Sequence, residues 1–161
     1  MLIDQDLAAI LSDNTKTISQ NIFWDKDEDH SGAQEFRVGV WSEADWPLQV
    51  YGWFNDQIGQ LSYSLLHLRD GRIVGLDLGD RLIHHNPDCN RRRRRTTCAC
   101  PRGTHKQVHS EQHQMRVAYV PADISASWDD PVSVWRQFCE EVRIEHLGTL
   151  AAPEWQGELE I

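Results

Sequence analysis

The feature of the sequence that most restricts the fold is an Asp-Gly pair between two apolar runs. Residues 61–68 and 72–78 are rich in leucine and other apolar residues, and they flank the turn Arg69-Asp70-Gly71. Asp-Gly between such runs is typical of a tight β-hairpin, because this dipeptide accepts the backbone conformation of a two-residue turn. The chain is therefore predicted to contain an antiparallel sheet.

Further strands are predicted on both sides of this hairpin. Apolar residues alternate with others over residues 36–41 and 48–54, and residues 117–120 form a short run that ends at Pro121. Strands joined by short connections form an antiparallel meander. The polar residues 25–32 lack the spacing of a calcium loop, so they are expected to form a solvated turn.

Two helices are predicted, one near each end of the chain. Residues 4–11 have the helical spacing of apolar residues, and a second helix starts at Asp129-Asp130-Pro131 and extends to about Ile144. Trp135 and Cys139 lie on the apolar stripe of this helix, so both are expected to be buried. The predicted fold is α+β: a single domain (1–161) with about five antiparallel strands and both helices packed on the sheet.

Composition excludes some classes of protein. The chain has 161 residues, of which 40% are hydrophobic, and contains no run of about 18 uncharged apolar residues that could span a membrane. Its first residues include acids and lack a basic region, so no signal peptide is expected, and a cytoplasmic location is the default. Cysteines in that compartment are more often thiols or metal ligands than disulfides.

Charge is distributed unevenly along the chain. Residues 88–116 contain eight Lys and Arg residues and two acids, which gives +6, whereas the whole chain carries −9 and the remainder therefore −15. A basic segment attracts phosphate groups, and an acidic body repels nucleic acid at long range. The alternative is that the arginines pair with acids of the same protein or are solvated.

Most of the reactive side chains lie in residues 83–113, a basic insert rich in histidine and cysteine. It contains five of the eight histidines and three of the four cysteines. One interpretation is a zinc site, because thiolates and imidazoles are the ligands that zinc prefers. Its candidate ligands are Cys89, Cys98, Cys100 and His109. The spacing is not that of a standard zinc finger, and there is no CxxC pair, so a cofactor-free protein with solvated thiols is the alternative.

A second interpretation is metal-independent cleavage of a phosphodiester. That reaction needs a general base, a general acid and a cation near the charged transition state, and histidine suits both proton transfers near neutral pH. His84 and His85 follow a predicted strand, and His105 with Lys106 could supply the second histidine and the cation. Adjacent histidines point in different directions, so one of His84 and His85 is expected to transfer protons.

A third interpretation is binding without chemistry, through contacts with the phosphates of RNA or another polyanion made by residues 91–106. The same cations could dock an acidic protein surface. The candidate residues are Arg91, Arg92, Arg93, Arg94, Arg95 and Arg102. Exposed aromatic residues, which a single-strand platform needs, are missing from this stretch.

Five segments of the second half resemble a family of small bacterial proteins that carry a domain of unknown function. They are GRIVGLDLG (71–79), HHNPDC (84–89), GTHKQVH (103–109), AYVPADI (118–124) and the helical segment 131–148. The resemblance implies no activity. It implies that the shared positions include His84, His85, Asn86, Pro87, His105 and Lys106. The arginine run, Cys98 and Cys100 depart from the pattern, which weakens the zinc interpretation.

Two functional hypotheses follow. The first is an RNA-directed, nuclease-like protein, similar in size and residue types to the toxins of bacterial toxin–antitoxin modules, which would have a cognate antitoxin. The second is a non-catalytic acidic protein of phage–host conflict that inhibits a defence nuclease, with the histidines and cysteines structural or zinc-binding. Neither hypothesis involves a membrane.

Overall fold

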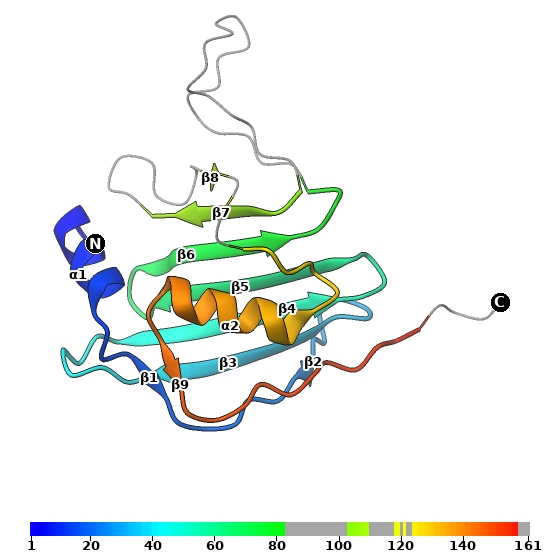
Figure 1. The fold of residues 1–161 in the computed structure, drawn as a ribbon, viewed down its shortest axis with the longest axis horizontal. Helices are drawn as coiled ribbons and strands as arrows, with labels where there is room; N and C mark the ends of the chain where they lie inside the picture. The colour runs from blue at the N-terminus through cyan, green and yellow to red at the C-terminus, as the bar shows by residue number, and fades with distance from the viewer. Residues whose placement is uncertain (83–102, 110–117, 120, 122–123, 158–161) are drawn as a thin grey trace, which may run out of the picture.

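The chain folds around one large antiparallel sheet (Figure 1). The computed structural model describes residues 1–82, 103–109, 118–119, 121 and 124–157. Seven strands lie in the order in which they occur in the sequence, so the sheet is a meander. They are β2 (Asp25–Lys26), β3 (Gln34–Val40), β4 (Leu48–Asn55), β5 (Gln60–His67), β6 (Gly71–Leu78), β7 (His105–Val108) and β8 (Ala118–Tyr119). The predicted α+β meander is confirmed, and the strand predicted at 117–120 contains β8. The two strands that were not predicted are β2 and β7.

The hairpin predicted at Asp70-Gly71 joins β5 to β6. Pairing between the two strands runs from Leu61 opposite Leu78 to His67 opposite Gly71. Gly71 has a φ of +88°, a left-handed conformation that glycine adopts without a steric penalty. The turn has three residues, 68–70, rather than the two typical of an Asp-Gly hairpin, and Gly71 supplies the positive φ that follows it.

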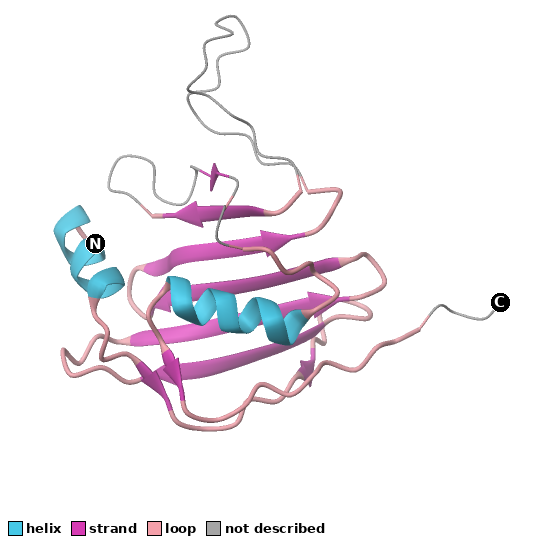
Figure 2. Cartoon of the chain, viewed as in Figure 1, coloured by secondary structure: helices cyan, strands magenta, loops and turns pink. Residues whose placement is uncertain are grey.

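Helix α2 (Pro131–Glu141) crosses one face of the sheet, as Figure 2 shows. Trp135 is 2% exposed and Phe138 is fully buried, and their rings lie 5.3 Å and 5.7 Å from the ring of Tyr63 on β5. The Tyr63 hydroxyl donates a hydrogen bond to the carbonyl of Pro131. Cys139 is buried, as predicted, and burial raises the pKa of its thiol to about 12.

The start of α2 is confirmed and its predicted end is wrong. The Asp130 carboxylate accepts a hydrogen bond from the Ser133 N–H at 3.2 Å, and Pro131 occupies the first turn. The helix ends at Glu141 rather than near Ile144. Arg143 has a φ of +54°, which is incompatible with a continuing helix. Ile144 is nevertheless buried, so the apolar pattern extends beyond the helical backbone.

A second, parallel sheet pairs a strand near the start of the chain with a strand near its end. It consists of β1 (Thr17–Ile18) and β9 (Glu145–His146), and it was not predicted. The N-terminal helix α1 (Asp4–Ser12) precedes it and buries Leu7 and Ile10. The ammonium group of Lys16, which is fully buried, donates hydrogen bonds to the carbonyls of Ile10 in the last turn of the helix and of Asp13 just past it.

Within the described part of the chain, neither helix has the length and apolar character needed to cross a membrane.

Candidate functional site

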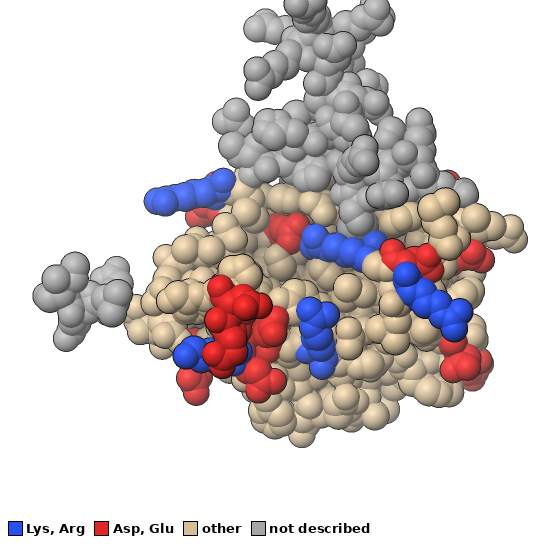
Figure 3. Space-filling model, turned by 180° about the vertical axis from the view of Figure 1, so that it is seen from behind, with Lys and Arg blue, Asp and Glu red and all other residues tan. Residues whose placement is uncertain are grey.

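The face of the sheet opposite α2 carries polar side chains that line up across the strands. Residues directly opposite one another in a sheet point to the same face. The pairing places Glu35, Trp53, Ser62, Asp77 and His105 in one such row, from β3 to β7. Figure 3 shows this face, with basic and acidic side chains distributed over it. The candidate site lies at the β6–β7 end of the row.

A β-bulge brings Arg72 onto this face. Leu65 pairs with Val74, but Leu66 pairs with Arg72, so Ile73 is the additional residue. Both Ile73 and Val74 are buried. Strict alternation along β6 would have placed Ile73 on the polar face; the bulge places Arg72 there instead.

Asp77 is the centre of the site. Its carboxylate accepts hydrogen bonds from the Ser62 hydroxyl at 2.5 Å and from Arg72 Nη2 at 3.1 Å, and it lies 3.4 Å from His105 Nε2. Gly75 leaves room for the guanidinium group, because a Cβ there would lie 2.2 Å from Arg72 Cζ. Burial alone would raise the pKa of Asp77, but the hydrogen bond with His105 and the charge of Arg72 outweigh it and lower that pKa to about 2.

His105 is held between two acceptors. Its Nδ1 lies 2.9 Å from the carbonyl oxygen of Gly103, and since a carbonyl only accepts, this nitrogen carries a proton. The hydrogen bond with Asp77 raises the pKa of the imidazole, against the effect of burial. His105 is 4% exposed, so its protonated form is enclosed by the protein and stabilised by the carboxylate.

The side chain of Lys106 lies on the other face of the sheet. In the strand register Lys106 is opposite Leu76 of β6 and Tyr119 of β8. It is 3% exposed and forms an ion pair with Glu141 of α2. Successive residues of a strand point to opposite faces. The sequence therefore placed His105 and Lys106 side by side, but the fold separates their side chains.

The basic insert leaves the sheet next to His105. The N–H of Gly103 donates a hydrogen bond to the carbonyl of Leu82 at 2.6 Å, which closes the base of the connection between β6 and β7. The other predicted site residues of this connection lie outside the described residues: His84, His85, Cys89, Arg91, Arg92, Arg93, Arg94, Arg95, Cys98, Cys100 and Arg102. Their predicted roles stay predictions.

His109 lies at the far end of β7. Its N–H donates to the Ile73 carbonyl, and four residues of extended chain, about 13 Å, separate it from His105. The described residues contain no group of three or more His, Cys, Asp or Glu side chains that could hold a metal ion. Three of the four predicted zinc ligands lie outside those residues.

A second histidine–carboxylate pair was missed by the sequence interpretation. Residues 25–32 were predicted to be a solvated turn, but Asp27 is only 6% exposed, and its carboxylate accepts hydrogen bonds from Trp53 Nε1 and from the Asp29 N–H. His30 Nδ1 lies 2.8 Å from the same carboxylate. The hydrogen bond from Trp53 is the main reason that the pKa of Asp27 is lowered. An Asp followed three residues later by His was the available signal.

No family model, curated protein or solved structure matches the chain. The resemblance of its second half to a family of small bacterial proteins therefore stays a prediction. What the fold defines is an α+β protein with one face of its sheet covered by a helix and a polar opposite face.

The protonated state of His105 should make stability depend on pH. Because its pKa is raised in the folded state, the stabilisation is complete below the ordinary histidine pKa of about 6.5 and is lost as pH rises through the raised value. We expect the free energy of unfolding to decrease as pH rises above about 6.5, and His105→Asn to reduce this decrease. Urea titrations of both proteins at each pH measure the difference.

The difference in pH dependence between the two proteins excludes the contributions of groups that titrate in both. One such group is Lys16, whose pKa is lowered by burial to about 8. Equal slopes for the wild type and the His105→Asn protein would contradict the assignment of this proton to His105.

Proposed function

We propose that this protein is an RNA-directed, nuclease-like protein in which His105 transfers a proton and residues 91–106 hold the RNA backbone. The observation that supports it most is the position of the His105–Asp77 pair, directly at the base of the basic connection. A carboxylate that raises the pKa of an imidazole favours the protonated form, which is the state a general acid requires.

In the proposed reaction, a second histidine removes the proton of the RNA 2′-hydroxyl. That oxygen attacks the adjacent phosphorus, the bond to the 5′-oxygen breaks, and the imidazolium of His105 gives its proton to the leaving oxygen. His84 or His85 is the proposed base. Leu82 and Gly103 are joined by a hydrogen bond, and His84 and His105 each follow one of these two residues by two positions. Movement of His105 away from the Asp77 carboxylate would free Nε2 for the substrate.

Arg72 replaces Lys106 as the proposed cation of the site. Its side chain lies on the same face as His105 and is 29% exposed, whereas the ammonium group of Lys106 pairs with Glu141 on the other face. A guanidinium group binds the oxygens of a phosphate in a planar, bidentate geometry. Lys106 has a structural role in this proposal.

The test compares two buried histidine variants on one labelled RNA. His105→Asn is expected to cleave the RNA at least about 100-fold more slowly than the wild type. His67→Asn is the matched control, because His67 is also buried and lies 2.9 Å from a carboxylate, Asp70, but at the opposite end of β6. Cleavage is measured with EDTA present, after circular dichroism has shown that both variants fold.

Equal cleavage by the two variants, or no cleavage by the wild type, would sink the enzymatic proposal. Expression in growing bacteria provides a second readout: a toxin arrests growth, and His105→Asn should relieve that arrest while His67→Asn should not.

The second candidate function is an acidic interaction protein that inhibits a defence nuclease. Acidic side chains gather at the β2–β3 side of the polar face (Figure 3), where Asp25, Glu28 and Asp29 are exposed and Glu35 is half-buried. Such a cluster can imitate the phosphates of a nucleic acid for a basic partner. Inhibition of a nuclease by a protein that does not bind RNA at about 0.15 M salt would favour this function over the first.

A further inference from the structure

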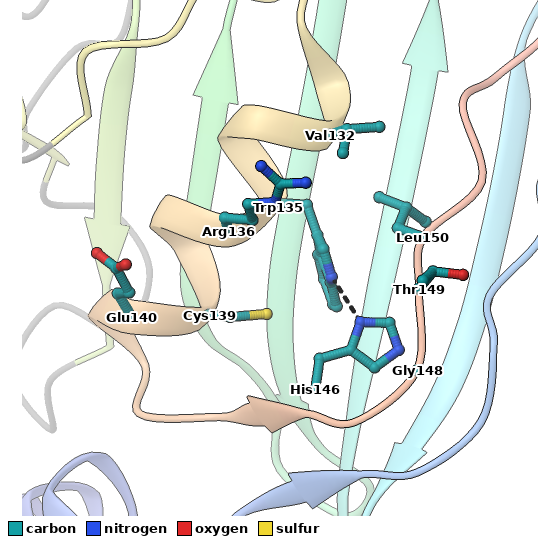
Figure 4. Close-up of a pocket in the computed structure, with 9 residues that line it drawn as sticks. All are labelled: Val132, Trp135, Arg136, Cys139, Glu140, His146, Gly148, Thr149 and Leu150. Atoms are coloured by element: carbon teal, nitrogen blue, oxygen red, sulfur yellow. Dashed lines mark hydrogen bonds between the residues drawn. The ribbon is translucent and has the colours of Figure 1, made fainter.

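A groove separates α2 from the extended chain that follows β9. Its volume is about 450 Å³, which is within the usual range for ligand sites. Figure 4 shows the side chains that line it, which come from one side of α2 and from residues 146–150. The groove is on the helix-covered side of the sheet, away from Asp77 and His105.

The floor of the groove is rigid and carries two aromatic rings. Trp135 Nε1 donates a hydrogen bond to His146 Nδ1 at 3.0 Å, and His146 Nε2 lies 2.8 Å from the carbonyl oxygen of Gln20. Because the indole only donates and the carbonyl only accepts, His146 is neutral with its proton on Nε2. Both rings are thereby held in place, with Leu150 beside them.

One wall of the groove is an unpaired backbone edge. The N–H groups of Leu147 and Ala151 donate to the carbonyls of Ile18 and Ile22, so these odd-numbered residues face β1 and the chain after it. Leu150 lies opposite Ile22 in a parallel bridge, so its own N–H points away from Ile22. The N–H groups of Leu150 and of Gly148, which lies in a bend, make no hydrogen bond with any described residue, and both residues line the groove.

The rim of the groove carries a cation that is available for a ligand. Arg136 is exposed on α2 beside Trp135 (Figure 4), and no carboxylate of the described residues lies within 4.0 Å of its guanidinium group. Guanidinium groups bind carboxylates through two parallel hydrogen bonds. Glu140, one turn further along α2, is also exposed at the groove, so an anionic group complements the Arg136 part of the rim.

We propose that the groove binds an extended peptide segment that carries a carboxylate. The peptide adds as a strand to the free edge at Gly148 and Leu150, lays alternate side chains over Trp135, and places its carboxylate on Arg136. Main-chain hydrogen bonds supply affinity in this mode of recognition, and the side-chain contacts supply specificity. This site is independent of the proposed RNA chemistry, because it lies on the other side of the sheet.

Selection from a random peptide library against the full-length wild-type protein tests the proposal. The affinities of the enriched peptides are then measured for three variants. Val132→Trp fills the groove from a partly exposed position of α2 and should abolish binding, whereas Arg136→Gln should weaken it about 10-fold. Arg69→Gln, in the exposed β5–β6 turn, is the matched control and should bind normally.

The amide signals of Gly148 and Leu150 should shift in NMR spectra when an enriched peptide is added. The proposal is overturned if no peptide is enriched, if the enriched peptides lack carboxylates, or if all three variants bind them equally. Shifts produced at these amides by an RNA oligonucleotide instead of a peptide would also overturn it.

Discussion

Substitution of Asp77 by Asn is expected to lower the free energy of unfolding by about 3 kcal/mol. The carboxylate lies between the cations of Arg72 and His105, at 3.1 Å and 3.4 Å, and its removal takes this counter-ion from both in a partly buried site. Loss of one partner of a fully buried pair costs about 3–5 kcal/mol, and the partial exposure of Arg72 places this site at the lower end. Urea unfolding at pH about 6, where His105 is protonated, measures the effect.

The matched control for this prediction is Asp70→Asn. Asp70 also lies near a histidine and a cation, but that cation is the terminal ammonium group of Met1, a residue whose side chain is 75% exposed. Solvent screens such a pair, so a smaller loss is expected. The prediction fails if the two substitutions have equal effects, or if the stability of the Asp77→Asn protein equals that of the wild type.

Substitution of Trp135 by Ala is expected to lower the free energy of unfolding by about 4 kcal/mol. The indole is 2% exposed, meets the rings of Phe36 and Tyr63 edge-on at 5.6 Å and 5.3 Å, and donates a hydrogen bond to His146. Its removal leaves a large cavity between α2 and the sheet and deprives His146 of its donor. Thermal and urea unfolding followed by circular dichroism give the loss.

Trp41→Ala provides the comparison, because the Trp41 side chain is 61% exposed. Its loss should change stability by less than about 0.5 kcal/mol. If the two tryptophan substitutions had equal effects, Trp135 would not be the central residue of the helix–sheet contact.

The parts of the fold that the sequence predicted are those that local chemistry determines. The Asp70-Gly71 turn and the start of α2 at Asp130 follow from backbone and capping preferences, and both are confirmed. The parallel pairing of β1 with β9 depends instead on two-residue strands that are far apart in the sequence, and no local pattern marks them. Parallel pairing of distant segments is decided by tertiary packing.

The site was harder to predict than the fold, because its geometry depends on which way each side chain points. Adjacent positions of His105 and Lys106 suggested a shared role, but β7 is an extended strand that sends them to opposite faces. Arg72 reaches the polar face only through a bulge, which shifts the alternation by one residue. Asp27 was assigned to solvent because its neighbours are polar, yet the indole of Trp53, distant in sequence, shields it.

The hydrogen bond from Gly103 to Leu82 has a further consequence for how such a protein can diversify. It fixes the two ends of the β6–β7 connection independently of the residues between them. Once loop ends are held together, doubling the length of the loop costs only about 0.6 kcal/mol. The sheet can therefore carry connections of different length and charge at this position without altering Asp77 or His105, so partner choice can change while the scaffold is retained.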